Sequence, residues 1–292
     1  MIFEDKFIAI NDVLKAEFDL LFDKALKSQQ QPNDLWLLEQ NAGYRNNFQE
    51  LGLKMPYCIG SFDEGHSEDT QTIFIDEYRN TYIANYSYSN YLKEIRWTEE
   101  NSQKVNSFKE MESISVQIEM LIYLKFWEAD LIIKKLNHFV SILNGEAFDW
   151  KFKIPKNSAG ARQKIIRERI RDNLKNISPI LYKTFDSTYK TQIRNAIAHS
   201  NYAILDRSIH LHNFKEDQYS TIEILTFDEW IDIFHNTLAL HNQYIALNNK
   251  INNYYGNLVK SSSNLLTVNF PTSNGNNTAI SFEYDPIFGS WA

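Results

Sequence analysis

Apolar residues recur at helical spacing along most of this chain of 292 residues. Between residues 3 and 30 they form one face of a predicted helix, which ends at a run of glutamines followed by Pro32. The longest pattern extends from Phe108 to Leu143 and stops at Asn144-Gly145, a common C-terminal signal. A single helix about 50 Å long is therefore predicted there.

Three further helices are predicted from similar signals. The first covers residues 161–176. The second begins at Ser178-Pro179, where serine can cap the helix and proline can occupy its first turn, and a break is expected near Phe185. The third runs from Phe227 to about Tyr255, and Gly256 predicts its end.

Only short β-segments are expected. Residues 202–212 predict a hairpin whose two-residue turn is Asp206-Arg207. Two more apolar runs, 265–270 and 279–284, lie in the Ser/Asn-rich end of the chain and predict either a second hairpin or a tail that docks elsewhere. The predicted fold class is therefore all-α with small β-hairpins.

Three consecutive regions are predicted, because a polar joint near residue 100 suggests a boundary close to 105. Residues 1–108 would form a helical N-terminal domain of unknown role, residues 109–256 a bundle of four or five helices, and residues 257–292 a C-terminal segment.

Within the first region, glycines and prolines gather between residues 33 and 70, where loops, short helices and an exposed turn at Asp63–His66 are expected. Beyond it, aromatic residues recur every four positions, which predicts one face of a helix. That face can pack in a core or stack nucleic-acid bases. The aromatic residues are Phe74, Tyr78, Tyr82 and Tyr86.

Composition excludes several classes of protein. At 43% hydrophobic residues the chain can form a sizeable core. The single cysteine, Cys58, excludes an internal disulfide and a cysteine-rich zinc site. The first residues lack the basic start of a signal peptide, and no stretch is long and apolar enough to span a membrane. We therefore expect a cytoplasmic protein that does not bind membranes.

The formal net charge of −7 argues against a protein that coats nucleic acid non-specifically, but the charge is unevenly distributed. Residues 151–175 hold nine basic residues and two acidic ones. On the predicted helix there, Lys164, Arg167 and Arg171 lie on one side of the apolar face. They form either a solvated surface or a contact for an RNA backbone.

The segment Thr191–Ser200 carries the residues best suited to chemistry. Asn195 and His199 are four residues apart, so they share a helix face, while Arg194 can reach the same site only through its long side chain. An imidazole can move a proton near neutral pH, and a guanidinium can neutralise a developing phosphorane charge. In the alternative reading His199 is a capping residue that donates to a carbonyl at the helix end.

Arg194, Asn195 and His199 resemble the Arg-x(4–6)-His motif of the HEPN superfamily of helical domains, over about residues 109–256. The resemblance implies a metal-independent endoribonuclease that needs no cofactor, in a toxin or phage-defence setting. Arg194 would hold the scissile phosphate, Asn195 would fix the geometry, and His199 would act as base or acid in attack by the RNA 2′-hydroxyl.

The resemblance also implies an acidic residue opposite the arginine. Glu128 and Asp130 are the candidates, of which Glu128 is preferred, and both can instead be solvated charges. The implied partners are RNA, a second copy of the chain and an antitoxin protein, with no preference for DNA. HEPN modules without catalytic activity, which bind RNA, a nucleotide or a partner protein, are the alternative function.

Other combinations of residues are weaker. His210 and His212 point to one side of a predicted strand, but no third metal ligand is evident, so no metal site is predicted. No glycine-rich phosphate loop or Ser-His-Asp arrangement occurs, which disfavours nucleotide hydrolysis.

Overall fold

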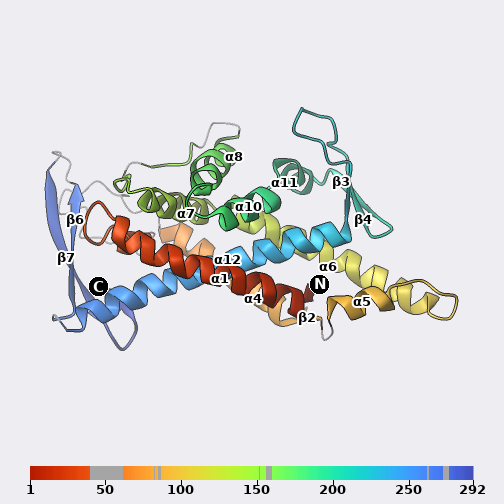
Figure 1. Ribbon diagram of the computed structural model, residues 1–292, viewed down its shortest axis with the longest axis horizontal. Helices are drawn as coiled ribbons and strands as arrows, with labels where there is room; N and C mark the ends of the chain where they lie inside the picture. Colours follow the sequence, from red (N-terminus) through yellow and green to blue (C-terminus); the bar gives the residue numbers. More distant parts are fainter. Residues whose placement is uncertain are drawn as a thin grey trace. The chain divides into compact units, whose positions relative to one another are not determined.

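The structure is a computed structural model, and the elements of the chain are mostly helices with small sheets of two or three strands (Figure 1). The all-α expectation is therefore correct in outline. The residues described are 1–39, 62–81, 83–84, 87–150, 152–155, 160–261, 263–271 and 276–291.

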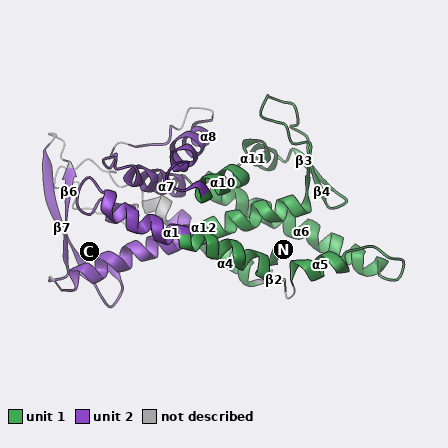
Figure 2. Cartoon of the chain, in the orientation of Figure 1, with its two compact units in different colours: residues 1–16, 70–129, 180–242 green, residues 17–69, 130–179, 243–292 purple. Residues whose placement is uncertain are grey.

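The chain divides into two compact units, and each is built from three separate segments (Figure 2). Unit 1 consists of residues 1–16, 70–129 and 180–242, and unit 2 of residues 17–69, 130–179 and 243–292. Neither unit is a continuous stretch, whereas the sequence suggests divisions near residues 108 and 256.

Unit 1 carries the helices and strands around the candidate motif. Its elements are β1 (Ile2–Phe3), the first half of α1 (Glu4–Ser28), most of α4 (Phe62–Thr81), β2 (Ile83–Ala84), α5 (Tyr88–Glu94), α6 (Ser102–Glu128), α10 (Pro179–Thr188), α11 (Thr191–Ala198), β3 (Tyr202–Leu205), β4 (Ser208–Leu211), β5 (Ile224–Thr226) and the first half of α12 (Phe227–Val259).

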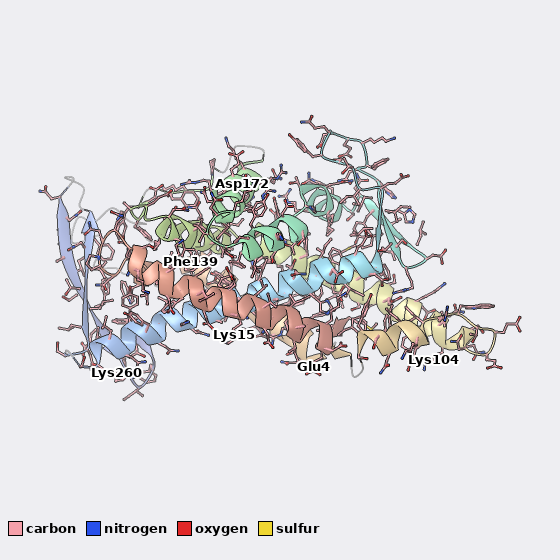
Figure 3. All side chains as sticks on the ribbon, in the orientation of Figure 1. Glu4, Lys15, Lys104, Phe139, Asp172 and Lys260 are labelled. Atoms are coloured by element: carbon pink, nitrogen blue, oxygen red, sulfur yellow. The ribbon has the colours of Figure 1, made fainter. Side chains whose placement is uncertain are left out.

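Unit 2 carries the remaining elements. They are the second halves of α1 and α12, α2 (Trp36–Glu39), the start of α4, α7 (Asp130–Leu143), α8 (Ala161–Lys164), the π-helix η1 (Ile165–Arg171), α9 (Asp172–Leu174), β6 (Leu265–Pro271), β7 (Asn277–Asp285) and β8 (Ser290–Trp291). Phe139 of α7 is labelled in Figure 3, and its ring stacks on Phe18 of α1 in the same unit.

The long helix predicted over residues 108–143 is wrong as a single element. It is broken at Ala129, whose backbone is extended at φ −71° and ψ 106°, so α6 ends at Glu128 and α7 begins at Asp130. Periodicity does not reveal this break, because one extended residue shifts the apolar pattern by less than a turn.

The predicted end of the last helix at Gly256 is also wrong, since α12 continues to Val259. Gly256 is required there for a different reason. A methyl group at this position would lie 2.8 Å from Cε1 and Cε2 of Tyr284 in β7. The glycine therefore permits close contact between helix and sheet rather than ending the helix.

Both predicted hairpins are confirmed. β3 and β4 pair antiparallel with Leu205 opposite Ser208, and the turn residues Asp206 and Arg207 have φ of 43° and 60°. Positive φ at both positions is the type I′ geometry that suits a two-residue hairpin. β5 adds a third strand beside β4. In unit 2, β6 pairs antiparallel with β7.

The predictions for the first 86 residues have different outcomes. Asp63–His66 is part of helix α4 rather than a turn. Tyr78 of the aromatic face is buried, in agreement with core packing. Tyr82 and Tyr86, Cys58, and the breakers Gly43, Gly52, Pro56 and Gly60 lie outside the described residues.

A fully buried carboxylate lies at the centre of unit 1. Glu119 of α6 accepts hydrogen bonds from Tyr78 at 2.6 Å, Trp230 at 2.7 Å and Ser115 at 3.1 Å, and it pairs with the amino group of Met1. Burial alone would raise its pKa, but the ammonium and the hydrogen bonds outweigh burial and lower it. These contacts join α4, α6 and α12 through one polar group.

Candidate functional site

The motif helix α11 is short and begins after a sharp break in the chain. The break lies at Tyr189-Lys190 rather than near Phe185 as predicted. Tyr123 of α6 bridges it: its buried hydroxyl donates to the Thr188 carbonyl at 2.9 Å and accepts from the Lys190 amide at 3.2 Å. Burial raises the pKa of this phenol, so it stays protonated and able to donate.

The opposite side of α11 is joined to the loop between β4 and β5. The buried Gln192 side chain donates to the Ile222 carbonyl at 2.6 Å and accepts from the Ile222 amide at 2.9 Å. Asn213 donates to the Gln192 carbonyl at 2.9 Å. With contacts on both sides, α11 has a defined position before any ligand binds.

Arg194 is held by two acceptors on its own unit. Its Nε pairs with Glu128 at the end of α6, and its Nη1 donates to Asn195 Oδ1 at 2.7 Å. The arginine side chain is 16% exposed. A guanidinium has five N–H donors, and these two bonds use two of them. Among the described residues, no other hydrogen-bond partner of Arg194 occurs.

Glu128, rather than Asp130, is therefore the acidic residue opposite the motif arginine. Asp130 instead accepts from Arg162 Nε at 2.6 Å in unit 2. The break at Ala129 explains why Arg194 pairs with only one of the two carboxylates, since Glu128 lies at the end of α6 and Asp130 at the start of α7. The sequence offered both residues, with Glu128 preferred.

His199 is the C-cap of α11 and its side chain is exposed. Its amide donates to the Asn195 carbonyl at 3.0 Å, so the two residues keep helical spacing. Ser200 then turns the chain at φ 52°. In the part of the chain that the structure describes, no group forms a hydrogen bond or ion pair with the imidazole, which is therefore open to a ligand.

The bonds after His199 form a Schellman motif. The Asn201 amide donates to Ala196 at 2.7 Å, and the Ser200 amide donates to Ile197 at 3.1 Å. The last carbonyls of α11 are thus capped by the backbone. The alternative reading, in which the imidazole itself caps a carbonyl, finds no such bond among the described residues.

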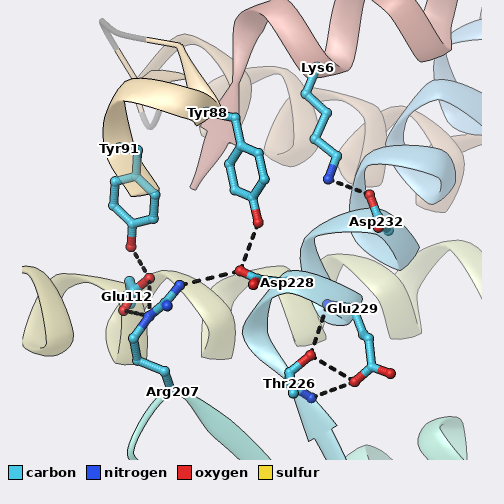
Figure 4. A network of polar contacts seen from close by, with 9 residues as sticks. All are labelled: Lys6, Tyr88, Tyr91, Glu112, Arg207, Thr226, Asp228, Glu229 and Asp232. Carbon is cyan, nitrogen blue, oxygen red and sulfur yellow. Dashed lines mark hydrogen bonds and ion pairs between the residues drawn. The ribbon is translucent and has the colours of Figure 1, made fainter. Parts of the chain in front are cut away.

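The hairpin that follows the motif is fixed by Arg207 at its turn (Figure 4). Arg207 Nε lies 2.9 and 3.0 Å from the two oxygens of Glu112, which is buried in α6 and also accepts from Tyr91. Tyr88 donates to Asp228 at 2.7 Å. Burial raises the pKa of Glu112, and the Arg207 guanidinium opposes this rise.

The predicted RNA-binding residues lie in unit 2, whereas the motif lies in unit 1. Lys164 is exposed and 3.9 Å from Glu168, and Arg171 Nε is 2.8 Å from Asp172. Arg167 is half-buried in the π-helix η1. That these residues share one site with the motif stays a prediction.

The remaining histidines lie outside the segment from Arg194 to His199. Among the described residues, no group of three or more His, Cys, Asp or Glu side chains is arranged to hold a metal ion. His210 is half-buried in β4 and His212 is exposed just after it. His235 is buried and uses both nitrogens, with Nε2 accepting from Phe3 and Nδ1 donating to Ile231.

The residues that position the motif carry no recognisable signal in the sequence. Tyr123, Gln192 and Asn213 have no special spacing relative to Arg194, and each resembles an ordinary residue of a helix or loop. Buried polar side chains require hydrogen-bond partners. The partners of Tyr123 and Asn213 are 21 to 67 residues away along the sequence, so no local pattern identifies them.

Comparison with protein-family models, with curated proteins and with solved structures finds no match to this chain. No helix in the described parts of the chain has the length and apolar character needed to cross a bilayer.

Proposed function

We propose that this protein is a metal-independent endoribonuclease of the HEPN type that acts in a toxin or phage-defence setting. The observation that carries the proposal is the arrangement at α11: Arg194 is oriented by Glu128 and Asn195, and the exposed His199 follows at the end of the same helix. An oriented cation and an accessible imidazole on the same short helix suit cleavage of a phosphodiester.

The residues would divide the chemistry as follows. The N–H groups of Arg194 that neither Glu128 nor Asn195 occupies would bind the scissile phosphate and stabilise its extra negative charge. The RNA 2′-oxygen would attack phosphorus as its proton passes to a base, and the departing 5′-oxygen would take a proton from an acid. The products are a 2′,3′-cyclic phosphate and a 5′-hydroxyl, and His199 would serve as the base or the acid.

One motif supplies one histidine, whereas base and acid act on opposite sides of phosphorus. A second copy of the chain, paired through the motif helices, would supply the other proton carrier. RNA is the proposed substrate because the mechanism requires the 2′-hydroxyl, which DNA lacks. Lys164, Arg167 and Arg171 are the proposed contacts for its backbone.

The test is RNA cleavage by purified protein in the presence of EDTA. Wild type is expected to cut RNA and leave 2′,3′-cyclic phosphate ends, and His199→Ala and Arg194→Ala are expected to lose at least about 100-fold in rate. His212→Ala is the matched control, since it removes another exposed histidine outside the motif. Equal cleavage by all variants would contradict the proposal.

A non-catalytic HEPN module that binds RNA, a nucleotide or a partner protein is the second candidate. The contacts of Arg194 favour it in one respect, because Glu128 already neutralises the charge that would attract a phosphate. Retained RNA binding without cleavage, weakened by Arg194→Ala, would support this function. If the protein is the proposed ribonuclease toxin, its antitoxin partner would bind over α11.

A further inference from the structure

Helix α6 exposes a row of large apolar side chains. Met111 is 48% exposed, Ile114 58% and Leu121 47%, and Ile118 between them is half-buried. Their spacing of three and four residues places all four on one face of α6, which lies within unit 1. The other face is already used, since Val116, Met120 and Tyr123 are buried in the core.

This row has the spacing of a coiled-coil seam. Met111 and Ile118 are seven residues apart, as are Ile114 and Leu121, so they occupy the a and d positions of successive heptads. Single exposed apolar residues are common on protein surfaces, but a continuous row at seam spacing indicates a helix that packs against a partner helix. The geometry therefore favours a helical partner with the same kind of apolar row.

We propose that the partner is α6 of a second copy of this chain, packed antiparallel, with the two-fold axis crossing the exposed row at the level of residue 116 along the helix. In this register Met111 of one copy meets Leu121 of the partner copy, and Ile114 meets Ile118. All four apolar side chains are then covered by apolar side chains. A two-fold interface is self-complementary, so one row satisfies both copies.

The charges at the ends of the row select this orientation. Lys125 continues the row one heptad after Ile118, and Glu110 lies beside Met111 at the other end. In the structure the Lys125 ammonium lies 5.4 Å from the centre of the Phe74 ring. In the dimer it would turn to the exposed Glu110 of the partner copy, because helical side chains lean toward the N-terminus. A parallel pair would instead place Lys125 against Lys125, which is unfavourable.

This surface is separate from the pairing through the motif helices proposed above, and it does not require ribonuclease activity. An axis at the level of residue 116 leaves the two Glu128 residues about 36 Å apart along the helix axis at 1.5 Å per residue. Lys104, labelled in Figure 3, marks the beginning of the helix that would form the interface. The two motifs would then lie at opposite ends of the helix pair.

The first experiment is sedimentation of the full chain over a range of concentrations. One pair of helix faces is smaller than a standard interface, so we expect pairing through α6 to be reversible, with a dissociation constant on the order of micromolar. Ile114→Ser and Leu121→Ser are each expected to raise this constant by about tenfold or more. Leu20→Ser is the matched control, since Leu20 of α1 is 66% exposed outside the row.

A charge exchange tests the antiparallel register. Glu110→Lys and Lys125→Glu are each expected to weaken the dimer several-fold, because like charges then face each other. The double variant Glu110→Lys/Lys125→Glu is expected to restore it, since the opposite charges meet again. Thermal melting by circular dichroism verifies that every variant remains folded.

A wild type that stays monomeric at all concentrations would overturn the inference. A dimer that Ile114→Ser and Leu121→Ser leave unchanged would also overturn it, because another face, such as the motif helices, would then form the dimer. Failure of the double charge variant to restore association would reject the antiparallel register. RNA cleavage is measured in a separate experiment. A failure to associate through α6 would therefore leave the ribonuclease proposal standing, and an absence of cleavage would leave the α6 pairing standing.

Discussion

Ser200 determines how the chain leaves the candidate site. It is a non-glycine residue with φ of 52° at the position after the helix cap, where glycine is usual. A side chain in this left-handed region costs about 1 kcal/mol because Cβ crowds the carbonyl oxygen. The serine is exposed, so no burial offsets the strain. The backbone strain at Ser200 is therefore confined to the turn immediately after His199.

Ser200→Gly should therefore stabilise the protein by about 0.5–1 kcal/mol, measured as the free energy of unfolding in urea. Ser187→Gly is the matched control. Ser187 is exposed within α10, where glycine should instead lower the free energy of unfolding by up to about 1 kcal/mol. A destabilised Ser200→Gly protein would contradict the left-handed assignment.

At the scale of elements, a glycine inside α12 allows the helix to contact the sheet of unit 2 closely. Gly256 lies inside a helix of 33 residues, where alanine is ordinarily more favourable. The ring of Tyr284 occupies the space that a side chain would need, and this ring packs against Trp291 with centroids 4.8 Å apart. The ring therefore cannot move away without disturbing the sheet of unit 2.

We expect Gly256→Ala to lower the free energy of unfolding by about 1–3 kcal/mol, despite the better helix propensity of alanine. The same substitution in a Tyr284→Leu background should cost less, because the smaller side chain leaves room for the methyl group. Urea unfolding of the two single variants and the double variant measures this coupling. Equal costs in both backgrounds would show that the contact is unimportant.

At the scale of the whole molecule, three buried histidines make stability depend on pH. Burial lowers the pKa of His138, His235 and His241 from 6.5 to about 4. In the unfolded chain they bind protons more readily than in the folded protein. The stability that their neutral forms contribute is therefore fully present above pH 6.5 and is lost as the pH falls toward 4.

Between pH 7 and pH 5 each histidine should remove about 2 kcal/mol of stability. Asp34 acts in the opposite sense, because burial raises its pKa to about 6 and protonation then favours the folded state. The net loss should be roughly 4 kcal/mol, measured by urea unfolding at the two pH values.

His138→Phe provides the control for this pH dependence. His138 is buried against Phe148 and Phe152, and among the described residues its Nδ1 has no hydrogen-bond partner. Phenylalanine keeps the stacking and removes the titrating group, so the loss on acidification should shrink by about 2 kcal/mol. An unchanged pH profile would show that His138 does not titrate in this range.

Local signals in the sequence predict much of this architecture. The first helix is indicated by its apolar periodicity and by the glutamines and Pro32 that follow it, and the helix after Ser178-Pro179 and the beginning of α12 at Phe227 are indicated by capping residues close in sequence. At α12, Thr226 and Glu229 exchange hydrogen bonds as a capping box, with Thr226 accepting from the Glu229 amide at 3.2 Å. The hairpin at residues 202–211 is equally local.

The sequence by itself determined the helical class, several helix boundaries that have a local start or stop signal, and the presence of Arg194, Asn195 and His199 on one helix, because these depend on neighbouring residues. Only the tertiary structure decided that α6 stops at Glu128, that this carboxylate rather than Asp130 meets Arg194, and that α12 passes through Gly256. Each of these depends on atoms brought together from distant parts of the chain, and spacing along the sequence carries no information about such contacts.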